Sequence, residues 1–568
     1  MLVQTTSASE PPYNEQRAKR HLRGWLSYAF ASEVFVVVSL TLFLPICLEQ
    51  FARDNGALLP DKTLPCTTAK TAPLNTRDDA EERCVVKIGW IWIDSASFSL
   101  YVYSISVALQ ALTVISMGGI ADHPPHRKRA LLLFAALGSI SAMLFLALPS
   151  SSPVWALAAL FAILANVGFG ASVVAMNAYL PTLAREDKEV VAALETLRTS
   201  EDGHTSETDS QELAFDENSH EEPLLSRRNV SMDAQELREK YTTLVSQTTS
   251  RISGSGIALG YFAGIVALII ALIPVTLMRG STFSLRLAIF ASGLWWALFT
   301  LPAWLWLPGA ASAEMKESSE LDSRFSLKRE LGRAWRRLGQ MLHWREVKRL
   351  NHTFRFLGAW FLLSDGFTTI TSTALLFGKT QLHMSAGSLV VVGLLVNAAG
   401  ILGALVWPRI QRYLKWSNKR ILIVLVLLCS FIPLYGCFGF LPLFHSNSSE
   451  AINLLTTPRF GGLTTPGEMF ALAVYFGTVY GAFQAYARAF YAELVPRGEE
   501  ARWYALYSIT DKSSSFLGPL AVGLIADRTG NIRYAFFFLV GMIWSAVPLL
   551  GSVNVERGRE DAERYVQR

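Results

Sequence analysis

Runs of about 20 mostly apolar residues recur along the whole chain and constrain its fold more than any other feature. Such a run is long enough for a helix to cross a hydrocarbon core roughly 30 Å thick. Inside that core every backbone N–H and C=O group must find a partner within the protein, so only helices and closed barrels can span it. Charged residues make up 17% of the sequence and lie mainly between the runs. The sequence therefore predicts an all-α integral membrane protein.

Twelve segments have this apolar character, and a long connector separates the first six from the last six. We expect spans near 25–48, 92–120, 130–149, 153–182, 252–275, 285–307, 354–378, 387–410, 421–441, 468–494, 503–526 and 533–552. The predicted organisation is an N-terminal tail 1–24, spans one to four in 25–183, a loop 184–250, spans five and six in 251–307, a linker 308–352, a C-terminal half 353–552 and a tail 553–568. This is a fold of twelve transmembrane helices in two six-helix halves.

The distribution of Lys and Arg predicts the orientation of these spans. Basic residues gather on alternate short connections, among them His126 to Arg129 and Arg409 to Arg420. The positive-inside rule places those connections, and both termini, in the cytosol. The net charge of +5 is modest, and no basic patch is interleaved with aromatic residues, which argues against nucleic-acid binding. The first apolar run, Trp25 to Leu48, is too long for the apolar region of a cleaved signal peptide.

Two long cytosolic insertions interrupt the helices. Within 184–250 the stretch from Glu201 to Glu222 is acidic and has no Lys or Arg, so we expect the loop to be disordered. Its segment from Glu221 to Leu225 is close to an acidic dileucine sorting signal, and the alternative is a plain linker. Within 308–352 apolar residues recur at helical spacing among Arg and Lys. They predict a basic amphipathic helix that lies on the anionic cytosolic leaflet, braces the two halves, or does both.

Short matches between the halves indicate an internal repeat. Phe30 to Phe35 in span one corresponds to Leu362 to Phe367 in span seven, and each stretch carries a carboxylate. Two further pairs match in the same order: Gly170 to Tyr179 with Gly481 to Phe490, and Ser253 to Gly256 with Lys512 to Ser515. The halves are therefore expected to share one architecture.

The connection between spans two and three resembles the signature loop of the major facilitator superfamily. It reads Gly118-Gly119-Ile120-Ala121-Asp122, followed by Arg127-Lys128-Arg129, and the segment from His123 to His126 departs from the usual pattern. In that family the Asp meets a helix N-terminus and helps to hold one gate state. Gly118, Asp122, Arg127 and Arg129 are thus candidates for a gating motif. A similar segment, Gly523 to Arg528, is an echo of this loop in the second half. It falls on the non-cytosolic side, where we expect no gating role.

Ionisable residues within the spans are costly, by about 2.5–3.5 kcal/mol on insertion scales, and so need a reason. The candidates for substrate binding or proton coupling are Glu33, Asp365, Asp511, Lys512, Arg488 and Asn177. In the functional interpretation Glu33, Asp365 or both exchange a proton. Lys512 or Arg488 would hold a substrate carboxylate, and Asp511 or Glu33 a substrate amine. In the structural alternative these charges neutralise one another, for example Asp511 with Arg488, or bond to polar neighbours.

The loops expected on the non-cytosolic side contain two cysteines and one glycosylation sequon. Cys66 and Cys84 share one polar loop and are candidates for a disulfide, with free thiols as the alternative. Asn447 is the one glycosylation sequon expected on that side, which would make the chain a glycoprotein. The sequence has no phosphate-cradling loop, no metal-ligand cluster and no nucleophile beside a base. We therefore expect no enzyme activity, no cofactor and no metal site, although a membrane hydrolase or scramblase stays open.

Along nearly all of its membrane portion the chain resembles the fungal autophagy-related protein 22 family. The resemblance rests on Gly24-Trp25, Tyr28 to Glu33, Leu48 to Arg53, Ala96 to Tyr101, Asn177 to Pro181 and Ala505 to Ser515. It implies a vacuolar membrane location and release of amino acids such as leucine to the cytosol after autophagic breakdown. Proton symport out of an acidic lumen would be a natural coupling. The alternatives are a sensor or receptor on a transport scaffold, and a porter of other small solutes or lipids. Partners are thus an amino acid, a proton and membrane lipids, and the oligomeric state is left open.

Overall fold

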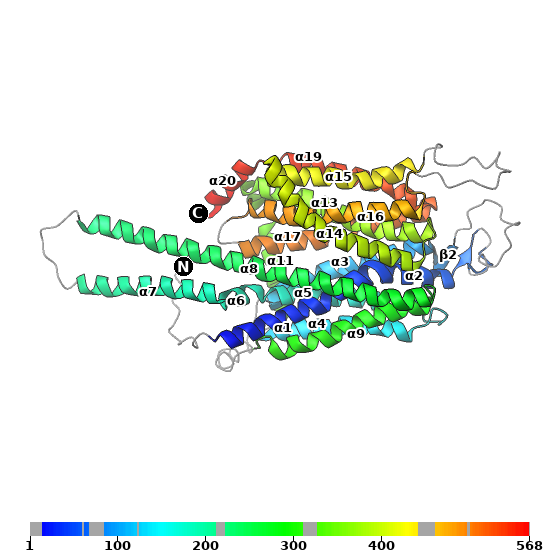
Figure 1. Cartoon of the computed structure of the whole chain (residues 1–568), viewed down its shortest axis with the longest axis horizontal. Coiled ribbons are helices and arrows are strands. Elements are labelled where there is room, and N and C mark those ends of the chain that lie inside the picture. The colour runs from blue at the N-terminus through cyan, green and yellow to red at the C-terminus, as the bar shows by residue number, and fades with distance from the viewer. Residues whose placement is uncertain are drawn as a thin grey trace.

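Nearly parallel helices form one elongated bundle in the computed structural model of this chain (Figure 1). The structure describes residues 14–59, 62–66, 84–121, 124–211, 222–309, 327–440, 461–496 and 500–566. One end of the bundle carries a small sheet, and we call it the sheet end. At the other end α1 begins and α20 finishes, and we call it the tail end (Figure 1).

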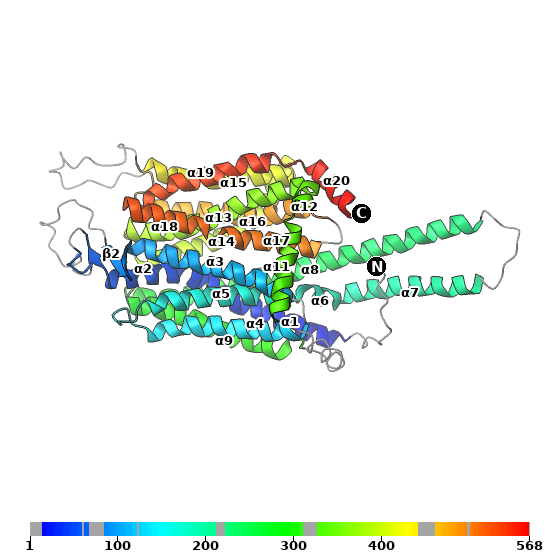
Figure 2. The same cartoon turned by 180° about the vertical axis from the view of Figure 1, so that it is seen from behind.

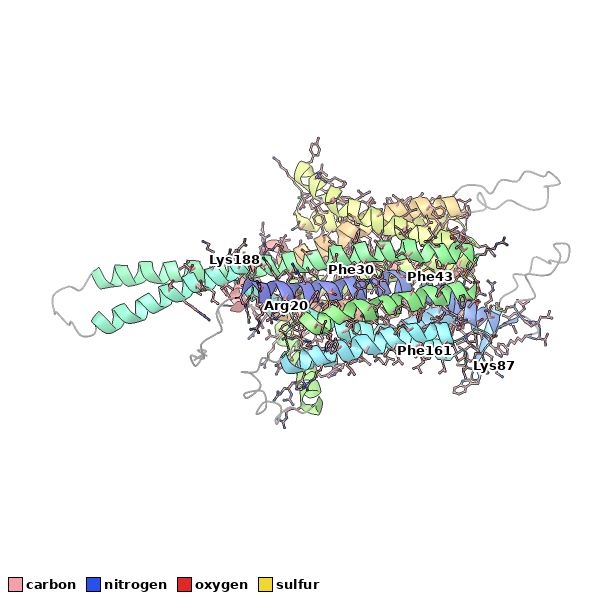
Figure 3. The ribbon with its side chains drawn as sticks, turned by 60° about the horizontal axis from the view of Figure 1, so that its bottom comes forward. Arg20, Phe30, Phe43, Lys87, Phe161 and Lys188 are labelled. Atoms are coloured by element: carbon pink, nitrogen blue, oxygen red, sulfur yellow. A yellow bond between two sulfur atoms is a disulfide. The ribbon has the colours of Figure 1, made fainter. Side chains whose placement is uncertain are left out.

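The first half of the bundle is built around one long N-terminal helix. Its elements are α1 (Glu15–Val34), the π-helical stretch η1 (Phe35–Phe43), α2 (Leu44–Asp54), α3 (Ser95–Ala121), α4 (Pro124–Leu144), the 3-10 turn η4 (Phe145–Ala147), α5 (Leu157–Asn177), α6 (Leu180–Arg185), α7 (Lys188–Gln211), α8 (Glu222–Leu277) and α9 (Thr282–Trp306). The first three run as a single 40-residue helix, along which Figure 3 labels Phe30 and Phe43. Both of these aromatic side chains belong to the apolar core or pack against it.

The remainder of the chain comprises the long connector predicted at 308–352 and the second half of the bundle. Its elements are α11 (Leu327–Met341), α12 (Trp344–Arg349), α13 (Asn351–Thr380), α14 (Ala386–Leu414), α15 (Asn418–Phe438), α16 (Pro466–Ala492), α17 (Glu500–Ser514), α18 (Leu517–Thr529), the 3-10 turn η6 (Ile532–Tyr534), α19 (Ala535–Gly551) and α20 (Val555–Val566). Span eleven is thus two helices, because α17 ends at Ser514 and α18 begins at Leu517.

Every predicted span coincides with a helix, or with a run of helices, in the bundle. Nine helices within the described residues are long and apolar enough to cross a membrane. The three other predicted spans are α13, α16 and the α17–α18 pair, and these elements carry Asp365, Arg488 and Asp511. Polar residues in these helices, and the break in span eleven, interrupt their apolar stretches. The chain is therefore a multi-pass membrane protein, and the count of twelve stays a prediction.

The expectation that 184–250 is disordered is wrong for most of that loop. Helix α7 occupies its first part, and α8 begins at Glu222, 30 residues before the predicted start of span five. The two helices project together from the tail end (Figures 1 and 3), and Arg251 Nη2 lies 2.8 Å from Asp187 Oδ2 between them. Because α8 continues a membrane helix, its outer part extends an existing helix and avoids the cost of nucleation. Residues 212–221, with the start of the dileucine-like segment, lie outside the described residues.

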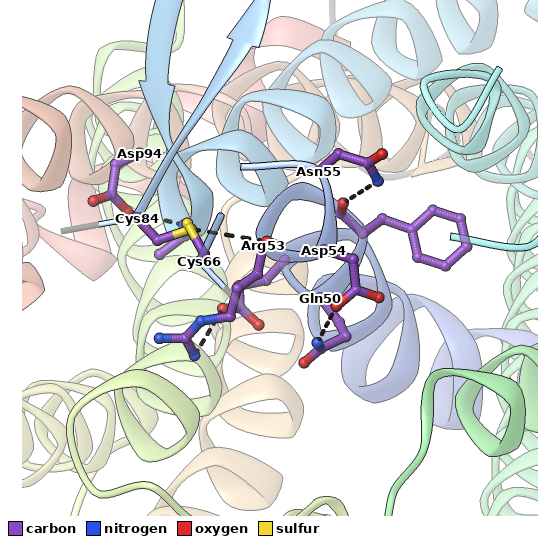
Figure 4. Close-up of a disulfide and its surroundings, with 10 residues drawn as sticks. Gln50, Arg53, Asp54, Asn55, Cys66, Cys84 and Asp94 are labelled. Atoms are coloured by element: carbon purple, nitrogen blue, oxygen red, sulfur yellow. Dashed lines mark hydrogen bonds and ion pairs between the residues drawn. A yellow bond between two sulfur atoms is a disulfide. The ribbon is translucent and has the colours of Figure 1, made fainter. Parts of the chain in front are cut away.

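The loop between spans one and two departs from the all-α prediction. It forms a three-stranded antiparallel sheet in the order β1 (Ala57–Leu58), β2 (Cys84–Ile88) and β3 (Ile91–Asp94), with Val85 opposite Asp94. Cys66 and Cys84 form a disulfide that ties this sheet to the preceding segment (Figure 4). Asn447 lies outside the described residues.

The predicted amphipathic helix forms α11, which crosses the bundle at its tail end (Figure 2). Trp335 Nε1 donates to Ser116 Oγ of α3 at 3.4 Å. Arg329, Arg333 and Arg336 are exposed along it. This position fits a brace between the halves, and contact with anionic lipid stays a prediction.

Small residues bring α14 and α16 into close contact, as membrane helices do when packing replaces the hydrophobic effect. A Cβ added at Gly403 would lie 2.1 Å from the carbonyl oxygen of Thr478. That same oxygen accepts a hydrogen bond from Trp407 Nε1 at 3.1 Å, so it cannot move away freely.

We predict that Gly403→Ala lowers the free energy of unfolding by about 1–3 kcal/mol, because it overpacks this contact. Gly541→Ala is the matched control, since nothing lies within 4 Å of a Cβ added at Gly541. Thermal unfolding of the purified variants in detergent measures the difference. Equal melting temperatures for the two variants would contradict the packing argument.

Candidate functional site

A cavity of about 3360 Å³ lies between the two halves of the bundle. Residues of α1, α3, α5 and α8 line it from the first half, and residues of α13, α14, α16 and α17 from the second. At the tail end its lining includes the exposed side chains Arg198 and Glu563. Toward the sheet end it finishes against the buried residues Leu463, Met469 and Phe536. The cavity therefore opens at the tail end.

Five of the six predicted site residues line this cavity: Glu33, Asn177, Arg488, Asp511 and Lys512. They come from α1, α5, α16 and α17, so the fold gathers residues that are up to 479 positions apart in the sequence. Glu33 is within electrostatic range of Lys512 and Arg488 on the opposite half. The wall contributed by the first half thus presents a carboxylate to two cations of the second half.

Asp511 and Lys512 form their own ion pair at the cavity wall. Lys512 Nζ lies 3.5 Å from Asp511 Oδ2, and Ser364 Oγ donates to Asp511 Oδ1 at 2.5 Å. The structural alternative from the sequence paired Asp511 with Arg488, and the ion pair in the structure is with Lys512 instead. The physical reason is adjacency, since both residues lie in the last turn of α17 and face the same cavity.

Asp365, the sixth candidate, is buried with 2% of its surface exposed and is not among the cavity-lining residues. Its Oδ1 accepts the backbone N–H of Gly518 at 3.0 Å. Gly518 lies in the first turn of α18, where the break in span eleven leaves N–H groups without an intrahelical partner. A carboxylate at a helix N-terminus is favoured by the helix dipole. The structure therefore gives Asp365 a capping role and separates it from Glu33, its counterpart in the repeat.

The amide side chains divide into cavity and packing residues. Asn177 is the last residue of α5 and lines the cavity with an exposed side chain. Asn166 is buried and accepts from Gln110 Nε2 at 3.0 Å through its Oδ1, while its Nδ2 donates to Ser106 Oγ at 2.7 Å. These bonds join α5 to α3, so Asn166 holds helices together although it also borders the cavity.

The predicted gating motif lies at the tail end of the first half. Gly118 is part of α3, and Asp122 lies outside the described residues. The Arg127 guanidinium stands 5.1 Å from the ring centre of Tyr179 and donates to Thr182 Oγ1 at 3.4 Å. Arg129 is exposed. The role of these four residues in gating stays a prediction.

An aromatic wall on the second half was not predicted from the sequence. The ring centres of Trp360 and Tyr507 are 4.6 Å apart, and those of Phe367 and Phe483 are 4.0 Å apart. Trp360 stacks on Phe483 at 5.6 Å and so joins the two pairs. The signal was present as Phe476, Tyr480 and Phe483 at helical spacing in span ten. Such spacing is also typical of an ordinary apolar core, which is why it did not single out a site.

Two polar atoms of this wall lack partners. Trp360 Nε1 and the Tyr507 hydroxyl are buried away from the cavity surface and have no hydrogen-bond partner among the described residues, while other atoms of both residues border the cavity. A buried donor without a partner costs about 1–3 kcal/mol, so these two atoms lower the stability of this arrangement of the wall. The described ranges contain no group of three His, Cys, Asp or Glu side chains placed to hold a metal ion.

Comparison with known proteins gives a consistent result. Residues 17–563 match the family described as "Vacuole effluxer Atg22 like". The sequence is 41% identical to autophagy-related protein 22 of Cryptococcus neoformans var. neoformans, over 96% of this chain and 97% of that protein. It is 39% identical to autophagy-related protein 22-1 of Neosartorya fischeri, over 98% and 94% respectively.

Among solved structures the chain is similar to a D-xylose-proton symporter, with a TM-score of 0.51 and 10% identity over 95% of this chain and 98% of that one. It is also similar to a POT family transporter in complex with a thioalcohol-conjugated peptide, with a TM-score of 0.51 and 12% identity over 94% of each chain. At such low identity these likenesses show the fold alone, which is the major facilitator fold.

We predict that Asp365→Ala lowers the free energy of unfolding by about 1–3 kcal/mol, because it leaves the Gly518 N–H buried without an acceptor. Asp365→Asn keeps a carbonyl oxygen at that position, so its free energy of unfolding should fall by less. Thermal unfolding of both purified variants tests the capping role. A loss for Asn as large as the loss for Ala would show that the charge, and not the acceptor, matters.

Proposed function

Because the chain belongs to the vacuole effluxer Atg22-like family, we propose that it releases amino acids from the vacuole lumen to the cytosol after autophagic degradation. Leucine and other neutral amino acids are the proposed cargo, moved by alternating access of the cavity to the two sides. The family and the fold make the chain a membrane transporter and not an enzyme. The vacuolar membrane, the substrates and the coupling are our proposals.

The observation that carries the substrate class is the chemistry of the cavity. A neutral amino acid has one cation, one anion and a side chain, and the cavity offers a partner to each. Glu33 faces the site as a carboxylate for the ammonium group, and Lys512 and Arg488 are cations for the carboxylate. The Trp360 and Tyr507 rings, which border the cavity, would contact an apolar side chain. Charged groups held away from bulk water interact more strongly, which favours a zwitterion over a sugar.

The proposed orientation places the tail end in the cytosol. The predicted spans put the basic connections and both termini on that side by the positive-inside rule. The Cys66–Cys84 disulfide lies at the opposite end, and disulfides persist in oxidising compartments outside the cytosol. With the cavity open at the tail end, the structure would correspond to the state that releases cargo to the cytosol.

The proposed proton coupling rests on Glu33. It lies on the cavity wall, where a change of access from one side to the other would change its surroundings. Asp365 is already used as a helix cap and is away from the cavity lining, so we assign it no part in coupling. A proton that binds Glu33 from the acidic side would neutralise the carboxylate. The side chain could then change its access from one side of the membrane to the other without carrying a negative charge.

We predict that Glu33→Gln abolishes the part of leucine efflux that depends on the pH gradient, while Asp365→Asn keeps most of it. Both variants remove one carboxylate from equivalent repeat positions, so each controls for the other. The measurement is efflux of labelled leucine from acid-loaded proteoliposomes of the full-length protein. If efflux in Glu33→Gln still depends on the pH gradient, Glu33 is not the group that couples efflux to protons. No efflux from the natural sequence across a panel of amino acids would contradict the substrate class.

Binding without flux is the signature of the alternative, a sensor or receptor on a transport scaffold. The projecting α7–α8 pair is the observation that favours it, because it offers a surface to cytosolic partners (Figure 1). Binding of labelled leucine to the purified protein, measured beside efflux, separates the two functions.

We predict that Trp360→Phe raises the half-saturating leucine concentration about threefold, because the smaller ring leaves less apolar surface against the leucine side chain. Trp304→Phe is the matched control, since Trp304 is 54% exposed on α9 and is not among the cavity-lining residues. Concentration dependence of uptake into proteoliposomes measures both. Equal behaviour of the two variants would place the substrate away from Trp360.

A further inference from the structure

Polar contacts between the two halves gather at the sheet end, opposite the opening of the cavity. One set joins α2 to α13, and another joins the start of α3 to α18. Ser104 Oγ, deeper in α3, also donates to the carbonyl oxygen of Phe516 at 2.7 Å. A cavity that opens to one side at a time needs contacts that hold the other side closed.

The first set is an ion pair between Glu49 of α2 and Lys379 of α13. Lys379 Nζ lies 2.5 Å from Glu49 Oε2, and both side chains are buried, with 1% and 14% of their surfaces exposed for Glu49 and Lys379. Lys379 Nζ also donates to the carbonyl oxygen of Ile46 at 2.9 Å. Arg53 Nη1 is 3.8 Å from the other oxygen of Glu49. Buried partners of this kind are strongly coupled, because removing one leaves the other without compensation.

The second set involves the Gly523 to Asp527 echo of the signature loop. Asp527 Oδ1 accepts the backbone N–H of Asp94 at 2.9 Å, and Asp94 in turn caps α3 by accepting from the Ala96 N–H at 2.9 Å. Ser97 Oγ donates to the carbonyl oxygen of Gly523 at 3.0 Å. An acidic residue in the last turn of a helix opposes the dipole of its own helix. The start of α3 offsets part of this cost for Asp527 while the two halves touch.

We propose that the Glu49–Lys379 ion pair and the Asp527 contact with the start of α3 are the gate that closes the sheet end. Both must separate before the cavity can open there. The Gly523 to Asp527 echo then has a gating role on its own side of the membrane, contrary to the expectation from its position. This inference rests on the proposed function, because a gate serves a molecule that alternates between two open states.

The separation of these contacts is feasible because water replaces them. When the sheet end opens, Glu49, Lys379 and Asp527 would become hydrated, so each would exchange a protein partner for solvent. The gate therefore shifts a balance between two states rather than locking one of them. Weakening either contact should increase the fraction of molecules that are open at the sheet end.

The test places a reporter cysteine in the cavity and measures its accessibility from the sheet end. Thr41→Cys provides the reporter, because Thr41 lies in η1 and lines the cavity. A membrane-impermeant maleimide is given to the sheet-end side alone of the full-length protein in proteoliposomes. The labelling rate of the chain without the reporter is subtracted, since the three free cysteines are buried or half-buried.

We expect Lys379→Met and Asp527→Ala each to raise this labelling rate at least fivefold, and Lys379→Arg to leave it near the starting value. Asp54→Asn is the matched control. Asp54 is a carboxylate of the same end, and its partners Gln50 and Thr282 belong to its own half, while the contact of Gln50 Oε1 with Lys379 Nζ is a long one of 3.5 Å. Asp527→Asn, a milder change, should shift the rate in the same direction by a smaller factor.

Unchanged labelling in Lys379→Met and Asp527→Ala would overturn the gate, and so would an equal rise in Asp54→Asn. If Asp527→Ala fails to fold, Asp527→Asn takes its place, and if Lys379→Met fails, Lys379→Gln does. Unchanged labelling in the replacement variant overturns the contribution of that contact. Labelling needs no substrate, so the result is independent of the proposed cargo. Failure of leucine efflux with a raised labelling rate would reject the cargo and keep the gate.

Discussion

A hydrocarbon layer supplies no hydrogen-bond partner, and most of this structure follows from that constraint. Where a helix is unbroken, the backbone satisfies itself. Where span eleven breaks between Ser514 and Leu517, the new helix start needs an acceptor, and Asp365 provides it from α13. A charge within the membrane is thereby explained by a defect in a neighbouring helix. The same constraint accounts for the burial of Glu49 with Lys379, since neither could remain alone.

The sequence was sufficient for the membrane class and for the positions of the helices, because these depend on apolar length. It also singled out Glu33, which lines the cavity, since a carboxylate in the middle of a span is conspicuous. It could not assign Asp365, whose partner Gly518 is 153 positions away in the chain. Nor could it separate the aromatic wall from an ordinary core, because both use the same spacing of aromatic residues. The order of 184–250 was misjudged, since acidic composition does not reveal that α8 continues a membrane helix.

Charge is distributed between the two halves in a way that makes each incomplete without the other. In the cavity, the first half presents Glu33 and the second half presents Arg488 and Lys512. At the sheet end, Glu49 of the first half meets Lys379 of the second, while Asp527 of the second meets the start of α3. At both levels charges of one half lie opposite charges of the other, so part of the attraction between the halves is electrostatic. Non-directional packing alone would hold them together without favouring one relative position.

Helix α8 is a single element of 56 residues that begins beyond the membrane boundary and continues along the cavity wall. At 1.5 Å per residue such a helix is about 84 Å long, and a stiff rod of that length acts as a lever. A tilt of roughly ten degrees about one end would move the other end by about 15 Å. Rearrangement of the cavity would thus be magnified at the far tip of the α7–α8 pair. Anything that restrained the tip would apply torque to the wall that carries Tyr261 beside Glu33.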